Sequence, residues 1–241
     1  MIDKNINKKK LNDELLEASF YGHSDIVKYL LTSPELKKHA NIHHQDNHGS
    51  NALMIACKKG SLDIVKYLLT SPELKEHADI HHKNNIGWDA LMAACNNGYL
   101  DIVQYLLTSS ELKEHAAIHH KDNHGWNSLM WACQNGSLDI VKFLLTSPEL
   151  QEHADISHKN NYGWNALMAA CNYGYLDVIQ YLIIDMNMNV DKETIKWLKG
   201  ENEDNIVYNN VLTLIDSRNL YQQLYNSIES NNSKKINGIK I

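Results

Sequence analysis

Histidine is the residue type whose spacing most suggests chemistry in this chain. Most of the 14 histidines fall in sets that recur every 38 residues. The sets are His39, His43 and His44; His77, His81 and His82; His115, His119 and His120; and, in part, His153 and His158. Imidazole nitrogens bind zinc, and histidine titrates near neutral pH. Two kinds of chemistry follow, namely metal binding and a response to pH.

The repetition of these histidines favours a structural role over a metal site. Zinc needs its nitrogen ligands at about 2.0–2.1 Å from one ion, whereas equivalent residues in stacked layers of helices start roughly 10 Å apart. The fourth copy also has Ser157 where the others have His43, His81 and His119. We therefore predict no metal ligand, and keep a metal- or pH-responsive protein as the alternative function.

Other catalytic arrangements are not indicated. The sequence shows no nucleophile with an acid or base partner, no glycine-rich phosphate loop and no paired carboxylates. We predict that the protein is not an enzyme, has no catalytic residue and needs no cofactor.

The four cysteines follow the same period, as Cys57, Cys95, Cys133 and Cys171. At the usual separation of helix layers they lie too far apart for disulfides. They are expected to be small, buried, reduced residues, which indicates a reducing compartment. We expect a cytoplasmic or otherwise intracellular protein, or one that works in a host cell if it is an injected or viral effector.

Charge and hydropathy restrict the partners. The net charge is −6 and Arg218 is the single arginine, so the basic surface that nucleic acids require is missing. No apolar stretch suits a signal peptide or a membrane span. The expected partner is a protein or peptide, with no nucleic acid and no membrane, and the expected state is a monomer.

The 38-residue unit itself predicts two helices and a loop. Asn51, Asp89, Asn127 and Asn165 stand where each can cap a first helix, and glycine ends that helix. The second helix begins near an aspartate, as at Asp63. Thr70 and Glu73 flank a proline with capping-box spacing, which predicts one extra helical turn there.

These units resemble ankyrin repeats. Residues 87–98 read GWDALMAACNNG, and an Ile-Val and Leu-Leu helix follows, as in the family's pattern. The resemblance covers residues 11–182 and implies an all-α ankyrin-repeat solenoid of stacked helix-turn-helix units with extended loops. Because terminal layers must face water, we also expect helical caps at both ends.

The expected organisation has five parts. Residues 1–10 would form a disordered polar tail, 11–46 an N-terminal capping repeat, and 47–190 four ankyrin repeats, the last of them degenerate at its end. Residues 191–230, with helices over 193–199 and 207–228, would form a C-terminal helical cap, and 231–241 a flexible tail.

The repeats depart from the family pattern in two ways. The family period is 33 residues, so these units are longer, and the Thr-Ser-Pro-Glu turn accounts for the excess. Met92 replaces the family histidine that joins neighbouring loops by hydrogen bonds, and His77 stands where relatives have glycine. Loop rigidity is thereby put in question.

Positions that differ between copies without disturbing the helices are free to contact a partner. In ankyrin proteins the loop tips and first helices form the concave binding surface, and the variable positions here match that surface. The predicted partner-binding residues are His48, Ser50, Lys58, Lys59, Ile86, Trp88, Asn96, Asn97, His124, Trp126, Trp131, Gln134, Asn135, Tyr162, Trp164, Asn172 and Tyr173.

The tryptophans have two interpretations that can coexist. The series Trp88, Trp126 and Trp164 suits a ladder in which each ring packs on the next loop and replaces the lost hydrogen bonds. Tryptophan is also enriched at interface hot spots. Trp131 occurs in one copy and is the stronger candidate for binding, although it could equally fill a local gap left by small neighbours.

Overall fold

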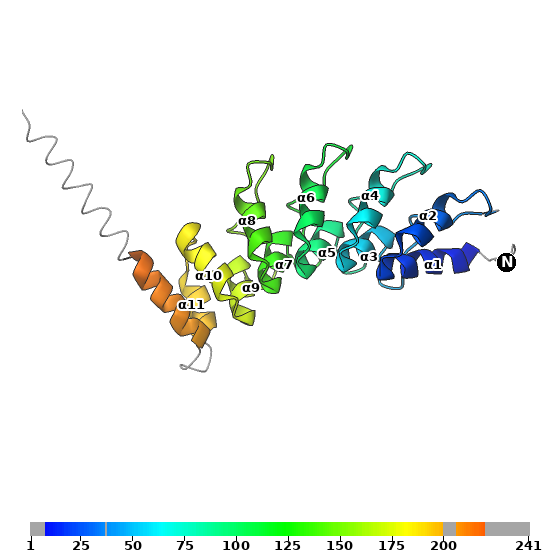
Figure 1. Ribbon diagram of the computed structural model, residues 1–241. Helices are drawn as coiled ribbons and strands as arrows, with labels where there is room; N and C mark the ends of the chain where they lie inside the picture. The colour runs from blue at the N-terminus through cyan, green and yellow to red at the C-terminus, as the bar shows by residue number, and fades with distance from the viewer. Residues whose placement is uncertain (1–7, 37, 200–205, 220–241) are drawn as a thin grey trace, which may run out of the picture. The chain divides into compact units, whose positions relative to one another are not determined.

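Helices account for the regular structure of the protein in the computed structural model, which describes residues 8–36, 38–199 and 206–219 (Figure 1). The described residues contain no strand, and two isolated β-bridges, Gln45 with Asn51 and Lys121 with Asn127, mark loops. The predicted all-α class is confirmed. The chain forms two units, Met1–Ala169 and Ala170–Ile241.

The first unit is a row of helix pairs. Its first helices are α1 (Lys8–Tyr21), α3 (Ala52–Lys59), α5 (Ala90–Asn97) and α7 (Ser128–Asn135). Its second helices are α2 (Ser24–Thr32), α4 (Leu62–Thr70), α6 (Leu100–Thr108) and α8 (Leu138–Thr146). Each first helix packs on the next first helix and each second helix on the next second helix, so that pairs stack as layers (Figure 1). The predicted repeat solenoid is confirmed.

The second unit contains less regular helices. Its elements are α10 (Leu176–Gln180), a π-helical turn η1 (Tyr181–Asp185), α11 (Lys192–Lys199) and a helix over 206–219. Helix α9 (Ala166–Tyr173) runs across the boundary between the units. The irregularity begins where the repeat pattern was expected to degenerate. The C-terminal cap stays a prediction, and the expected part of its helix beyond residue 219 lies outside the described residues.

The first helices are capped as their sequences indicate. The side chains of Asn51 and Asp89 accept a hydrogen bond from the backbone N–H three residues on, at 3.0 and 2.9 Å, and Asn127 and Asn165 do the same. Gly60 ends α3 with φ of +76°, a left-handed conformation that favours glycine. These caps fix where each layer begins and therefore which side chains face inward.

At its N-terminus the first helix is longer than expected. Helix α1 begins at Lys8, although the tail was expected to run to residue 10. Residues 1–7, the rest of that tail, lie outside the described residues.

The extra helical turn predicted after each second helix is wrong. Helix α4 continues through Thr70, whose hydroxyl donates to the carbonyl of Lys66 rather than capping a new helix. Ser71 then turns to an extended ψ of 125°, because the proline that follows disfavours helical backbone at the residue before it. The Ser71 carbonyl accepts from Leu74 N–H in a tight turn, and its hydroxyl accepts from Glu73 N–H.

The cysteines lie in the core as predicted. All four are buried and form no disulfide, and burial raises the pKa of the Cys57 and Cys95 thiols well above the ordinary value and that of Cys171 to about 12. Thiolate is the reactive form of cysteine, so these thiols are both covered and protonated.

We expect the four thiols of the native protein to react with a thiol-specific reagent no faster than local or global unfolding exposes them. Adding denaturant should release all four thiols rapidly, and the rate under native conditions should rise with urea. Absorbance after addition of a disulfide reagent measures this. One thiol reacting at the rate of free cysteine in the native protein would contradict the core placement.

Candidate functional site

Neighbouring loops of the first unit are joined by a series of asparagines. The side-chain amide of Asn85 donates to the carbonyl of Asn47 over 3.1 Å, that of Asn123 to Asn85 over 3.0 Å, and that of Asn161 to Asn123 over 3.1 Å. The backbone N–H of each donor asparagine also bonds to the preceding loop, as Asn85 does to His48. We call these contacts the asparagine joints. Neighbouring loops are thus joined by hydrogen bonds from asparagine, although the family histidine is absent.

The histidines also make structural contacts. The ring N–H of His77 donates to the Ser71 carbonyl over 3.0 Å, which fastens each loop to the end of its second helix, and His39, His115 and His153 repeat this contact. The rings of His82 and His158 donate to the carbonyls of Gly49 and Gly125 over 2.7 Å. His77, which stands where ankyrin repeats have glycine, therefore holds its loop in place through the bond to Ser71.

The remaining recurrent histidines face carboxylates. His43, His81 and His119 lie 3.6, 3.6 and 3.1 Å from Glu76, Glu114 and Glu152, and His44 lies 3.5 Å from Asp13. His120 differs, because its Nδ1 lies 3.0 Å from the buried carboxylate of Asp89, the one cap that is not asparagine. Over the described residues, no three histidine, cysteine or acidic side chains come together as metal ligands.

Loop tips carry the first group of predicted binding residues, and the structure leaves them open to solvent. His48, Ile86, His124 and Tyr162 are all exposed. The His124 Nδ1 and the Tyr162 hydroxyl lie 3.0 Å apart and their rings stack at 5.9 Å. Two successive tips of this row therefore form one aromatic patch.

The C-terminal ends of the first helices carry the second group. Lys58 and Lys59 are exposed, whereas the asparagine and glutamine pairs of the next two layers, Asn96, Asn97, Gln134 and Asn135, are half-buried. The side-chain amide of Asn97 already donates a hydrogen bond within its own helix, to the Ala93 carbonyl over 2.8 Å. Asn172 and Tyr173 are exposed but belong to the second unit.

Trp131 gathers the tryptophans into one group. Its ring centroid lies 4.5 Å from that of Trp88 and 4.7 Å from that of Trp126, and Trp126 lies 6.0 Å from Trp164. We call these four residues the tryptophan cluster. All four are half-buried. Trp131 connects Trp88 with Trp126, whereas Trp126 and Trp164 contact each other directly, so the series is not uniform from layer to layer.

One polar atom of the tryptophan cluster lacks a partner. The indole N–H of Trp131 is buried, and no acceptor among the described residues lies within hydrogen-bonding distance of it. Ser50, the equivalent of Trp88 in the preceding loop, is half-buried and faces the Asn84 amide at 3.4 Å. The aromatic surface therefore begins one layer later, at Trp88.

Two residues of this surface were missed in the sequence. Phe20 and Tyr21, at the end of α1, hold the places that Lys58 and Lys59 hold one repeat later, and both are exposed. The ammonium of Lys59 lies over the Phe20 ring, 3.9 Å from its centroid. Counting back one period from Lys58 would have found them.

Comparisons with known proteins agree with this architecture. A family profile described as "Ankyrin repeats (3 copies)" matches residues 15–115, 71–151 and 110–194. No curated protein matches the chain. None of the helices in the described part of the chain has the length and apolar character needed to span a membrane.

Proposed function

The chain belongs to the ankyrin-repeat family, whose repeats generally act as protein–protein interaction modules, and from this premise we propose that it binds a protein or peptide on the surface of its loop tips and first helices. The tryptophan cluster would anchor that partner. We propose that this protein binds its partner as a monomer. Its net charge of −6 argues against nucleic acid as the partner.

The tryptophan cluster is the observation that carries this proposal. Four half-buried aromatic rings offer a large apolar area at little entropic cost, which is typical of interface hot spots. Exposed Ile86 and Tyr162, on loop tips two repeats apart, add further apolar area. The half-buried Gln134 and Asn135 at the end of α7 would supply a polar rim.

Trp131 is the residue that we expect to matter most. Its ring contacts the rings of both Trp88 and Trp126, so that removing it would divide the cluster and take away part of the apolar area offered to a partner. The histidines, by contrast, already have partners within the fold. Because the described residues also contain no group of three ligands for a metal ion, we propose neither a metal-responsive function nor a role in catalysis.

Affinity capture from a lysate of the source cell tests the proposal. The immobilised baits are the wild type, Trp126→Ala/Trp131→Ala and, as a matched control outside the surface, Trp197→Ala in α11. We expect one protein to be retained by wild type and Trp197→Ala and lost by the double variant. A hot-spot loss of about 2 kcal/mol or more corresponds to roughly thirtyfold in affinity.

Two further measurements make this result decisive. All baits must melt at the same temperature, so that loss of binding does not report loss of the fold. Trp131→Phe keeps an aromatic ring but removes the N–H, and should weaken binding to a smaller degree. Retention of the same proteins by the wild type and the double variant would contradict the proposal.

A further inference from the structure

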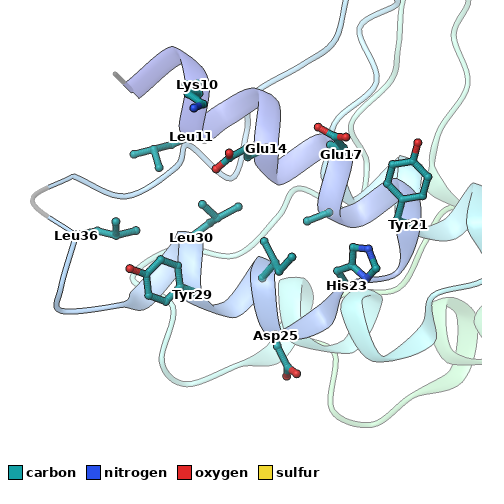
Figure 2. A pocket seen from close by; sticks show the side chains of 12 residues that line it. Lys10, Leu11, Glu14, Glu17, Tyr21, His23, Asp25, Tyr29, Leu30 and Leu36 are labelled. Atoms are coloured by element: carbon teal, nitrogen blue, oxygen red, sulfur yellow. The ribbon is translucent and has the colours of Figure 1, made fainter. Parts of the chain in front are cut away.

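The free face of the first layer contains a groove between α1 and α2. Its cavity volume is about 1020 Å³, and Figure 2 shows its lining. The floor is apolar, with Leu11, Ala18, Ile26, Leu30 and Leu36. We call it the N-terminal groove. It shares Tyr21 with the candidate binding surface, but its lining contains no loop-tip residue and no residue of the tryptophan cluster.

The repeat shows what this face does elsewhere in the chain. Ile26 is 46% exposed, whereas its equivalents in the next three layers, Ile64, Ile102 and Ile140, are 1%, 0% and 1% exposed. These later layers each have a layer packed before them. The apolar face of α1 and α2 is therefore a surface that the same fold covers with helices at every following step.

Contacts between successive layers indicate which side chains a covering helix supplies. The Lys28 ammonium lies 5.7 Å from the centroid of the Tyr67 ring, and the Thr32 hydroxyl lies 3.4 Å from the Tyr67 hydroxyl. Lys66 and Thr70 repeat both contacts on Tyr105, at 5.5 and 3.4 Å. The equivalent tyrosine in the first layer is Tyr29, which lines the groove. A lysine and a threonine four residues apart on one helix would fit it.

Charge favours a basic occupant in particular. Among the described residues that line the groove, three are carboxylates, Glu14, Glu17 and Asp25, against the one ammonium of Lys10 and the imidazole of His23 (Figure 2). Two copies of this face brought together would oppose acid to acid, which is unfavourable. A helix with lysine beside its apolar stripe would instead place opposite charges in contact.

We propose that the N-terminal groove binds an amphipathic helix of a partner protein, with an apolar stripe flanked by lysine. Such a helix would lie in the groove as helical ligands do in other hydrophobic grooves. Its apolar side would cover Ile26 and Leu30, and its lysine would meet the Tyr29 ring and the surrounding carboxylates.

The chain provides its own probe for this groove. A hydrocarbon-stapled, fluorescently labelled peptide with the sequence of residues 61–71 carries Lys66 and Thr70 in the spacing that contacts Tyr105. Fluorescence polarisation with the full chain should show saturable binding. Ile26→Glu should weaken it by about tenfold or more, because a carboxylate would be buried against the apolar stripe.

Two matched controls isolate the groove and the charge. Ile206→Glu makes the same change at an exposed isoleucine of the second unit, which belongs neither to the groove lining nor to the proposed binding surface, and should leave peptide binding unchanged. The peptide with Lys66→Glu should bind about fivefold or more weakly, since it opposes the groove's carboxylates. Both protein variants are expected to melt near the wild-type temperature.

Several results would overturn the inference. Absence of saturable binding, equal binding by Ile26→Glu and wild type, or equal binding of the Lys66→Glu peptide each would do so. A concentration-dependent dimer that Ile26→Glu abolishes would assign the groove to a second copy. Binding only after deletion of residues 1–7 would assign it to the chain's own segment. None of these results depends on the tryptophan cluster.

Discussion

Replacing Ile102 with alanine is expected to lower the free energy of unfolding by about 2–5 kcal/mol, the range for truncating a fully buried isoleucine. Ile102 has no exposed surface and lies in α6, in the middle of the first unit. The substitution removes three buried carbons and leaves a cavity that neighbouring layers cannot fully close. Urea denaturation followed by far-UV circular dichroism measures the loss.

Ile26→Ala is the matched control for this substitution. It changes the same residue type at the same place in the repeat, but Ile26 is 46% exposed because it lines the N-terminal groove. We expect a loss below about 1 kcal/mol. Equal effects of the two substitutions would mean that the free face of the first layer is covered in solution.

Replacing Gly87 with alanine is expected to destabilise the protein by about 2–4 kcal/mol, from left-handed strain and a steric clash. Gly87 has φ of +84°, and an added Cβ would lie 2.6 Å from the Asn123 side-chain oxygen and 2.7 Å from the Asn123 backbone nitrogen. That nitrogen donates to the Ile86 carbonyl and belongs to an asparagine joint. Relief of the clash would therefore break the contact between two loops.

Gly163→Ala separates the two causes. Gly163 has nearly the same φ, +79°, but its added Cβ would meet no heavy atom within 4 Å among the described residues. Strain alone should cost about 1 kcal/mol. Thermal unfolding of both variants gives the comparison, and a Gly163→Ala loss as large as that of Gly87→Ala would show that the joint tolerates the extra carbon.

Local features of the fold followed well from the sequence. The caps at Asn51 and Asp89 depend on a side chain and an amide three residues apart, so spacing alone predicts them. The capping box at Thr70 failed for an equally local reason, since a helix already running through Thr70 commits its hydroxyl to Lys66. Both readings of Thr70 satisfy the same spacing, and only the position of the helix end distinguishes them.

Features of the candidate site that join one layer to the next were harder to predict. The sequence indicates only that Asn85 lies in a turn, but in the structure its side-chain amide donates a hydrogen bond to the Asn47 carbonyl of the preceding repeat. Likewise, Trp131 contacts Trp88 of the previous loop, which depends on the offset between layers. The 38-residue period shows which residues are equivalent in successive repeats, but it does not show in which direction their side chains point. The binding residues named from the sequence stay predictions for the same reason.

The asparagine joints bear on how such a chain changes length. The amides of Asn85, Asn123 and Asn161 each donate to the carbonyl of the equivalent asparagine in the preceding loop, so that successive junctions are interchangeable. Excising residues 85–122 would bring Asn123 opposite the Asn47 carbonyl with a complete junction, whereas excising any fraction of a unit would not. Gene duplication and loss can thus add or remove whole modules while the surviving junctions stay intact.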